Sequence, residues 1–361
     1  GMGMRHAYGY TEILKIFGKQ GVPGAEPIKL AAVCDLHTGP ANSVADMVQQ
    51  ETGFRPRVYV DFETMLSEVS DLDAIDIVTD TPWHHKFSIA ALESGRHAMT
   101  EKPMGLTLKA CRQMRDASEK NGKILSVAEN YRRDPLNRLT LELINSGAIG
   151  NPYFAVDIGM GSAGGAVMHS TVWRAKKNLA GGMVMDAGVH NADMLLYLMG
   201  PADTVFAETA TYETQRELRD MSSVAHNLAD MYRHRVESGG KTGDIIEQDA
   251  VDTVFSLIKF KSGAIGQLCL TDVSHGETIG QSSIHGSNGT LLRTSSRSGK
   301  PPIIRRPNGE EIVGNDLLSL VPDWRLDEVT ATLWDSDRIG SYDLDWRDID
   351  KKIVAIEYAD L

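Results

Sequence analysis

The sequence predicts a Rossmann-type α/β domain, a doubly wound parallel sheet, followed by an α+β domain with a large, mostly antiparallel sheet. Over residues 1–125, short apolar strands alternate with helices, which is typical of a parallel sheet covered on both faces. Beyond residue 126 the strands are longer, alternate in hydropathy and are separated by glycine-containing turns. At 361 residues the chain also exceeds one ordinary core. We therefore expect two domains, 1–125 and 126–361.

The elements expected in the first domain follow one another without long loops. Apolar runs ending in an acid or a turn residue predict the strands, and amphipathic stretches such as the one ended by Gly95 predict the helices. The expected strands are 28–35, 58–61, 74–79, 97–100 and 124–128, and the expected helices are 10–17, 41–52, 62–69, 86–94 and 108–121.

The second domain is expected to place helices on one side of its sheet. Its helices are 136–145 and 185–199, with an amphipathic helix beginning at 348, and its strands are 153–158, 204–211, 250–260, 264–274, 282–286 and 290–292. Residues 215–248 are polar and predict an inserted excursion. Its segment 232–235, Tyr-Arg-His-Arg, would close over a substrate, contact another subunit or form a solvated helix.

The composition argues against a nucleic-acid-binding protein and against a membrane-spanning one. Lys and Arg number 37 against 49 Asp and Glu, giving a net charge of −12, which is unfavourable for binding nucleic acid. No apolar run approaches the roughly 20 residues that span a bilayer, so no membrane partner is expected. The cysteines Cys34, Cys111 and Cys269 fit neither a metal site nor a disulfide framework, and this favours a cytoplasmic location.

The first residues form a glycine turn that could bind a dinucleotide. Gly1, Gly3 and Met4 would let the backbone and the next helix's N-terminus approach a pyrophosphate, although His6 stands where a third glycine is usual. No apolar strand precedes the turn, so that strand and any targeting signal are expected to lie outside this sequence. Asp35 ends the next strand, where its carboxylate would accept ribose hydroxyls and repel a 2′-phosphate. This favours NAD over NADP, although Asp35 could equally cap the following turn.

Two further segments follow strands at the carboxyl edge, where ligands bind in such sheets. Thr79, Thr81 and His84 could pack against the nicotinamide; alternatively, the strand simply stops here and His84 caps a helix. In Glu101-Lys102-Pro103, the lysine could donate a charged hydrogen bond to a substrate hydroxyl. The alternative is an ordinary solvated lysine.

The segment 181–193 carries a possible acid/base pair. Asp186 and His190 are four residues apart, and Asp193 lies three further on, so one helix would present all three on one face. A histidine beside a carboxylate suits proton transfer near neutral pH. A purely structural pair or a metal site are the alternatives, but no second cluster completes a metal site, so no metal is expected.

Together these motifs resemble the Gfo/Idh/MocA family, named after glucose-fructose oxidoreductase, inositol dehydrogenase and the rhizopine catabolism protein. The similar segments are 1–3, 79–84, 91–97, 101–103, 129–132, 146–150, 173–174, 181–193 and 263–266. The resemblance implies a nicotinamide-dependent oxidoreductase acting on a sugar, cyclitol or related polyol. It also implies a homodimer or homotetramer that associates through the open face of the large sheet.

The family resemblance assigns roles to individual residues. Lys102, Asp186 and His190 are implied as the catalytic set, which would also touch the substrate. Glu101, Lys102 and Asn130 are implied as cofactor contacts, and the other substrate-pocket positions are Tyr131, Arg132, Trp173 and Arg174. The chain departs from the family in lacking the first strand, the third glycine and the closing C-terminal elements.

The expected reaction is reversible oxidation of a ring secondary alcohol. Its hydroxyl would lie between His190, which takes the proton, and Lys102, which holds the developing oxyanion, or with these two roles exchanged. Asp186 would orient the imidazole or grip a neighbouring hydroxyl. The alternatives are a glycoside lyase or hydrolase that retains NAD and oxidises the sugar transiently, and a sensor that binds NAD without turnover.

Overall fold

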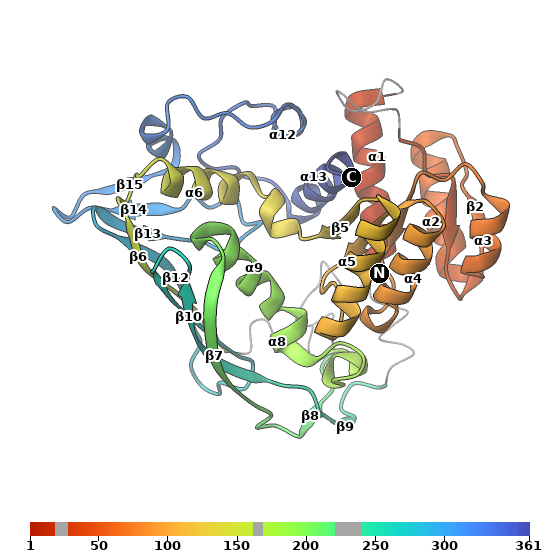
Figure 1. Cartoon of the computed structure of the whole chain (residues 1–361), viewed down its shortest axis with the longest axis horizontal. Coiled ribbons are helices and arrows are strands. Elements are labelled where there is room, and N and C mark those ends of the chain that lie inside the picture. Colours follow the sequence, from red (N-terminus) through yellow and green to blue (C-terminus); the bar gives the residue numbers. More distant parts are fainter. Residues whose placement is uncertain (19–27, 162–168, 221–239) are drawn as a thin grey trace. The chain divides into compact units, whose positions relative to one another are not determined.

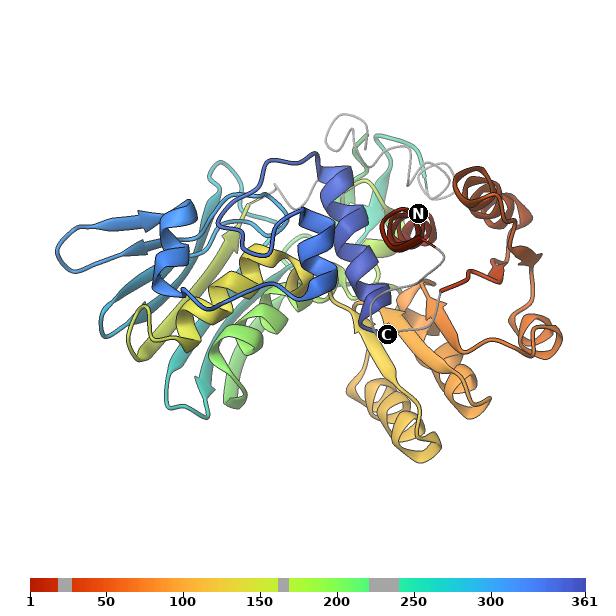
Figure 2. The ribbon, with the colours of Figure 1, turned by 90° about the horizontal axis from the view of Figure 1, so that it is seen from above.

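The structure is a computed structural model that describes residues 1–18, 28–161, 169–220 and 240–361. The chain divides into two compact units, coloured by sequence in Figures 1 and 2. The first unit contains 1–133, 327–337 and 346–361, and the second contains 134–326 and 338–345. The predicted division at residue 125 differs from this one chiefly because the C-terminal part of the chain is shared between the units.

The first unit has five parallel strands, as predicted. The strand β1 (Ala32–Cys34) pairs with β2 (Arg57–Tyr59), and β3 (Ala74–Ile77), β4 (His97–Glu101) and β5 (Leu125–Ala128) form a second sheet in that order. The helices are α1 (Met2–Phe17), α2 (Thr38–Thr52), α3 (Phe62–Glu68), α4 (Thr81–Glu93) and α5 (Leu108–Asn121). One apolar core joins both sheets: it contains Ile75 and Ile77, and Ala32 and Cys34 pack against it. The predicted α/β fold is thus confirmed.

The C-terminal helices return to the first unit. They are α12 (Glu328–Trp334) and α13 (Trp346–Ala359), and α13 packs against α1. The two helices lie so close that a Cβ on Gly9 would stand 2.5 Å from Cγ1 of Val354. A buried pair formed by Arg5 on α1 and Asp350 on α13 adds a charged link. A single domain boundary near residue 125 could not describe this return of the chain.

The second unit is built on an eight-stranded sheet in the order β15-β14-β13-β12-β6-β11-β10-β7. Its strands are β6 (Pro152–Met160), β7 (Ala202–Ala210), β10 (Thr253–Phe260), β11 (Ile265–Thr271), β12 (Ile279–Gly286), β13 (Gly289–Leu292), β14 (Ile303–Arg305) and β15 (Glu311–Val313). Only β6 and β11 pair in parallel, so the predicted mostly antiparallel sheet is confirmed. The short pair β8 (Gln215–Glu217) and β9 (Ile245–Glu247) borders the expected excursion, and its segment 232–235 lies outside the described residues.

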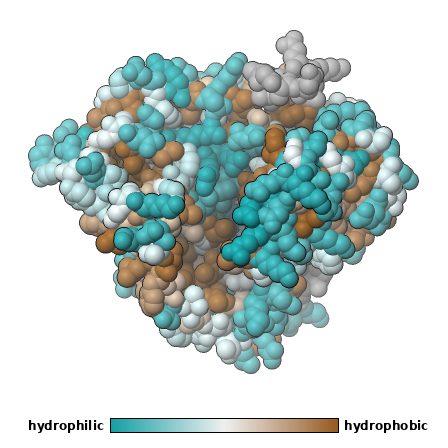
Figure 3. All heavy atoms as spheres, viewed as in Figure 1, coloured by the Kyte–Doolittle hydropathy of each residue, from teal (hydrophilic) through white to brown (hydrophobic). Residues whose placement is uncertain are grey.

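Among the described residues, helices cover one face of this large sheet. They are α6 (Pro135–Asn145) and α9 (Gly188–Met199), which lie against the sheet in Figures 1 and 2. The other face exposes apolar side chains, including Phe206, Leu257 and Ile265, each more than half exposed. Part of this apolar surface is visible as brown spheres at the lower left of Figure 3, over β10. The sheet therefore has one packed and one open face.

The single helix predicted over 185–199 is two helices. The first is α8 (Gly182–Asp186), and α9 begins at Gly188 after a break at Ala187. Close packing explains the glycines here, because a Cβ on Gly182 would stand 2.5 Å from the Val251 carbonyl oxygen and one on Gly188 would stand 2.9 Å from Leu270. The predicted single helix is thus corrected, because Asp186 ends α8 and His190 lies on α9, while the shared face of the two side chains stays a prediction.

Candidate functional site

Lys102 stands where the first unit's sheet ends, directly after β4. The preceding residue, Glu101, is the last of this strand and only 4% exposed. Its Oε2 accepts the backbone N–H of Lys102 at 2.8 Å, and its Oε1 lies 3.1 Å from Nε2 of His6. The peptide bond from Lys102 to Pro103 is cis. Both oxygens of Glu101 are thus engaged within the protein, and its predicted contact with a cofactor stays a prediction.

His84, on α4, joins the loop that follows β3 to the loop that follows β4. Its Nδ1 lies 2.9 Å from the carbonyl oxygen of Pro103, and its Nε2 lies 3.0 Å from that of Thr79. Burial lowers the pKa of His84, while the hydrogen bonds to these two carbonyl oxygens oppose the shift. Thr81 begins α4 and is buried. His84 therefore ties the loop of the predicted nicotinamide contacts to the loop that carries Lys102.

The glycine turn lies at the beginning of α1. Gly1 is the N-cap, and Gly3 and Met4 lie in the first turn, where the N–H of Met4 donates to the carbonyl of Gly1 at 3.2 Å. A Cβ on Gly3 would stand 3.4 Å from Cγ2 of Val78, so the helix start lies close to the residue that follows β3. This arrangement is the one that the glycine motif uses to bring backbone N–H groups near a pyrophosphate.

Asp35 lies just beyond the end of β1, as predicted. Its Oδ1 accepts the backbone N–H of His37 at 2.9 Å, and its own N–H donates to the carbonyl of Tyr59. The carboxylate therefore stabilises the turn into α2, as the alternative interpretation expected. The position at the carboxyl end of a parallel strand is also the one that a ribose-binding acid requires.

Three of the predicted contacts lie together on the short helix η2 (Asn130–Arg133). Asn130 is buried, Tyr131 and Arg132 are half-buried, and the N–H of Tyr131 donates to Oε1 of Glu129 at 3.1 Å. This group belongs to the first unit, although the prediction assigned it to the second domain. Its proposed contacts with cofactor and substrate stay predictions.

In the second unit the structure brings Trp173, Arg174 and Asp186 together. Trp173 and Arg174 lie on the short helix η3 (Val172–Ala175). The Nε of Arg174 donates to Oδ2 of Asp186 at 2.8 Å, and its guanidinium carbon stands 4.2 Å from the centroid of the Trp173 ring. The side chains of Arg174 and Asp186 are only 7% and 10% exposed. An arginine is always charged, so Asp186 is held as a carboxylate beside a fixed cation.

His190 lies in the first turn of α9 and is 7% exposed. A neighbouring pair fixes this helix on the sheet, because Nδ2 of Asn191 lies 3.3 Å from both carboxylate oxygens of Asp157 on β6. Asp157 is in turn 3.6 Å from NH1 of Arg293. Burial raises the pKa of Asp157, while Arg293 and Asn191 oppose this shift. Asp157 is not among the predicted site residues, although an acid within the apolar strand 153–158 was a possible signal.

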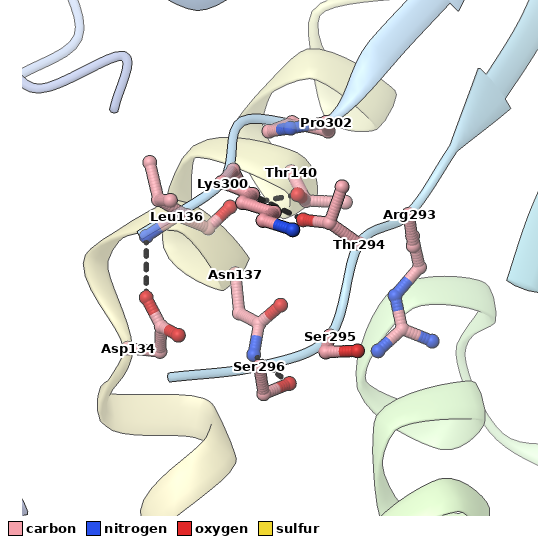
Figure 4. A pocket seen from close by; sticks show the side chains of 10 residues that line it. All are labelled: Asp134, Leu136, Asn137, Thr140, Arg293, Thr294, Ser295, Ser296, Lys300 and Pro302. Atoms are coloured by element: carbon pink, nitrogen blue, oxygen red, sulfur yellow. Dashed lines mark hydrogen bonds between the residues drawn. The ribbon is translucent and has the colours of Figure 1, made fainter. Parts of the chain in front are cut away.

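Two hollows in the surface bear on ligand binding, and neither is lined by a predicted catalytic residue. One lies between α6 and the segment after β13 and has room for a single water molecule, so it is too small for a sugar. Figure 4 shows its polar lining, which includes Asn137, Thr140 and Lys300. The other is an open groove of about 510 Å³ beside α4, lined in part by Trp83 and Lys86.

The predicted catalytic residues are divided between the units. Lys102 belongs to the first unit, whereas Asp186 and His190 belong to the second. Their expected convergence on one hydroxyl therefore stays a prediction. Among the described residues no group of three or more His, Cys, Asp or Glu side chains could hold a metal ion, and no described helix is long and apolar enough to cross a membrane.

Two family models match the chain. Residues 4–129 match the model described as an oxidoreductase family with an NAD-binding Rossmann fold, and residues 138–292 match the GFO/IDH/MocA C-terminal domain. Together they cover more than half of the chain. This confirms the predicted family and the NAD-binding character of its first domain.

Curated relatives match parts of the chain. Levoglucosan dehydrogenase from Pseudarthrobacter phenanthrenivorans is 31% identical over 225 residues, which are 62% of this chain and 55% of that protein. An α-N-acetylgalactosaminidase from Shewanella oneidensis is 30% identical over 157 residues, or 42% of this chain and 32% of that protein. The chain thus aligns with about half or less of the length of these relatives.

Solved structures show the same fold over almost the whole chain. An NAD-binding oxidoreductase from Klebsiella pneumoniae superposes with a TM-score of 0.71 at 21% identity, covering 99% of this chain and 85% of that one. Levoglucosan dehydrogenase in complex with NADH and L-sorbose gives a TM-score of 0.70 at 22% identity with the same coverage. At this level of identity the likeness concerns the fold alone.

Proposed function

The chain belongs to the Gfo/Idh/MocA family of oxidoreductases, and from this premise we propose that it is an NAD-dependent dehydrogenase acting on a secondary alcohol of a sugar, cyclitol or glycoside. The observation that carries the proposal is Lys102, held by its backbone against the buried Glu101 at the carboxyl end of β4 in an NAD-binding domain. The similarity to levoglucosan dehydrogenase, which has been solved with NADH and L-sorbose, supports a carbohydrate as the substrate.

The residues at the start of α1 and the end of β1 fit a dinucleotide. Gly3 lies in the first turn of a 16-residue helix, whose partial positive charge favours an anion such as a phosphate group. Asp35 presents a carboxylate where the ribose of NAD would bind and where a 2′-phosphate would be repelled. NAD, when bound, would supply the acceptor for a hydride. The chain's own residues would accept the proton of the substrate hydroxyl.

The roles proposed for individual residues follow from their surroundings. His190 accepts the proton of the alcohol, because imidazole exchanges protons near neutral pH. The ammonium of Lys102 stabilises negative charge on the same oxygen as it develops. Asp186 remains ionised beside Arg174 and orients the imidazole or a substrate hydroxyl. Tyr131, Arg132 and Trp173 are proposed as contacts to the sugar.

A substrate screen with the purified protein tests this proposal. Monosaccharides, inositols, anhydrosugars and glycosides are each incubated with NAD and, in parallel, with NADP, while the absorbance of reduced nicotinamide is followed. We expect turnover with at least one polyol and a clear preference for NAD. If NADH binds but no compound is oxidised, the chain is better described as an NAD-binding sensor.

The similarity to the Shewanella α-N-acetylgalactosaminidase favours a second candidate, a glycosidase that retains NAD. In that reaction the sugar is oxidised, the aglycone is eliminated and the product is reduced again, so no net NADH accumulates. A chromogenic nitrophenyl glycoside distinguishes the two candidates. Release of nitrophenol that depends on NAD but leaves no NADH would identify the glycosidase, whereas NADH formation without release identifies the dehydrogenase.

We also propose that the protein forms a homodimer or homotetramer through the open face of the large sheet. Phe206, Phe255, Leu257 and Ile265 are between 47% and 64% exposed there. Apolar patches of this kind usually mark interfaces. Sedimentation of Leu257→Glu beside the parent protein tests this idea, since an interface on this face predicts a smaller species for the variant and an unchanged mass would contradict it.

A cytoplasmic location is proposed on the basis of the cysteines. Cys34, Cys111 and Cys269 are all free thiols, and burial raises the pKa of Cys34 to about 11, so this thiol stays protonated. Free thiols of this kind suit a reducing compartment. Fractionation of cells that produce the protein, with a periplasmic marker enzyme as the control, tests the location.

A further inference from the structure

A buried charge network links the start of α1 to the residue before Lys102. His6 on α1 is 2% exposed and lies between two carboxylates, with Nδ1 2.7 Å from Oδ2 of Asp76 on β3 and Nε2 3.1 Å from Oε1 of Glu101 on β4. The hydroxyl of Tyr358 on α13 donates to the same oxygen of Asp76 at 2.6 Å. Residues from two strands and two helices therefore meet around one imidazole.

The geometry requires a doubly protonated ring. An ionised carboxylate only accepts hydrogen bonds, and a neutral imidazole has a single N–H, so only an imidazolium can donate to both Asp76 and Glu101. Burial alone would lower the pKa of His6, but the two carboxylates outweigh it and hold that pKa well above its usual value. In return, although burial would raise it, the pKa of Glu101 falls to about 2, chiefly through His6.

The other charged groups around His6 do not replace it. Arg5 on α1 is paired with Asp350 on α13, and Arg133 on η2 is paired with Asp360. Glu357 on α13 is 1% exposed, and burial raises its pKa to about 8, so it is mostly protonated at neutral pH. The charge of Glu101 is therefore balanced inside the unit mainly by His6, with smaller contributions from Lys102 and Arg5.

We propose that His6 is a positioning residue for Lys102. The imidazolium fixes Oε1 of Glu101, and this leaves Oε2 directed at the backbone N–H of Lys102. The proposal rests on the proposed function, because it gives His6 a role only if Lys102 takes part in catalysis. Where the family motif has a third glycine, this chain has a buried cation that holds the end of β4. Small displacements of a catalytic group can reduce a rate by about a hundredfold.

The variant His6→Gln tests the proposal, because glutamine keeps a hydrogen-bonding side chain but cannot carry the charge. We expect kcat to fall about ten- to a hundredfold while the Kd for NADH changes less than about threefold. Tyr358→Phe is the matched control: it removes one hydrogen bond from the same network and leaves the charge of His6 in place. Wild-type kcat in His6→Gln would overturn the proposal, as would an equal loss in Tyr358→Phe.

The pH dependence of kcat distinguishes a positioning role of His6 from a merely structural one, which would not change it. Above the pKa of His6 the imidazolium loses its proton, so kcat should decline on the alkaline side of the profile. Asp76→Asn removes one of the two carboxylates and should move both this decline and the titration of His6 to lower pH by about one unit. Nitrogen NMR of labelled histidine follows that titration in the protein without substrate. A ring that is neutral at pH 7, or a decline that does not follow the titration, contradicts the proposal.

The failure of this inference can be told apart from a failure of the proposed function. If Lys102→Ala remains fully active, the proposed role of the lysine is wrong, whatever His6 does. If Lys102→Ala is inactive and His6→Gln is as active as the wild type, the reaction stands and only the positioning role of His6 fails. Thermal unfolding of each variant shows whether a loss of activity reflects a loss of folded protein.

Discussion

In the first unit Lys102 follows a carboxylate whose main counter-charge is the imidazole of His6, whereas in the second unit Asp186 is paired with the guanidinium of Arg174. Both arrangements are buried, and both hold a candidate catalytic residue in place. They differ in the cation, because an imidazolium can lose its proton within the working pH range of a protein and a guanidinium cannot. The first arrangement therefore loses its charge above the raised pKa of His6, on the alkaline side, whereas the second keeps its charge.

The two units also differ in how they accommodate buried charged groups. Arg174 and Asp186 form a buried ion pair, so removing either takes a partner of opposite charge away from the other. In the first unit a buried carboxyl group is neutral instead. Burial raises the pKa of Glu357 to about 8, so this group keeps its proton at neutral pH. The charges of Arg174 and Asp186 are thus independent of pH near neutrality, whereas the charge of the cluster around His6 and Glu357 depends on pH.

The largest effect is expected from Lys102→Ala. Loss of a group that stabilises charge or transfers a proton should lower kcat by about 10²–10⁴, which corresponds to roughly 3–5 kcal/mol of barrier. NADH binding, measured by fluorescence, should persist, because the backbone bond to Glu101 does not need the side chain. Lys109→Ala, an exposed lysine on α5, is the control and should keep wild-type turnover. Normal turnover in Lys102→Ala would show that Lys102 has no catalytic role, and the first unit would then hold no catalytic lysine to compare with the second unit's Asp186.

The second effect concerns stability in the other unit. Arg174→Met leaves the carboxylate of Asp186 buried beside an apolar chain, and the free energy of unfolding should fall by about 3–5 kcal/mol. The double variant Arg174→Met, Asp186→Asn should recover part of this loss. Chemical denaturation measures both.

An exposed pair in the same unit is the control for this prediction. Arg305 and Glu311 lie 2.6 Å apart, but their side chains are 56% and 48% exposed. Arg305→Met should therefore change the free energy of unfolding by less than about 1 kcal/mol. Equal losses in Arg174→Met and Arg305→Met would show that burial does not distinguish the two pairs.

The local sequence pattern predicted the parts of the fold that depend on local order. The alternation of strands and helices placed Lys102 at the end of β4 and Asp35 at the end of β1, and the structure has both there. It could not predict the return of α13, because pairs such as Asp76 with Tyr358 join residues that are 282 positions apart. A charged residue inside an apolar run was the available signal: Asp76 stands within Ala-Ile-Asp-Ile.

For a similar reason, the residues of the candidate site were predicted but the contacts between them were not. The residue types Trp173, Arg174 and Asp186 were all identified, but their mutual contacts were not, since η3 and α8 are separate elements. Spacing alone predicted one helix for Asp186 and His190, whereas the structure has a break at Ala187, between two glycines that pack closely against distant backbone and side chains. A local pattern does not contain such contacts.

A smaller effect with an unusual sign is expected at Glu357. Its pKa is about 8 in the folded protein and near 4.5 in an unfolded chain, so between these pH values folding keeps a proton that the unfolded chain releases. This costs stability at neutral pH and nothing below about pH 4. Glu357→Gln should therefore raise the free energy of unfolding at pH 7 by up to about 3 kcal/mol, and the gain should vanish at pH 4. Glu63→Gln, at an exposed site on α3, is the control. If the gain in the free energy of unfolding does not depend on pH, the protonation of Glu357 is not its cause.

The smallest expected effect would show whether the first unit also determines the choice of cofactor. Asp35→Ser keeps a hydroxyl that can accept the N–H of His37, so the turn into α2 should survive. It removes the carboxylate proposed to bind the ribose of NAD and to repel a 2′-phosphate. We expect the Kd for NADH to rise about tenfold, or roughly 1.4 kcal/mol, and the Kd for NADPH to fall. Asp71→Ser, an exposed acid beyond α3, should change neither. If Asp35→Ser binds both cofactors as the wild type does, Asp35 only caps its turn, and cofactor choice must depend on other residues.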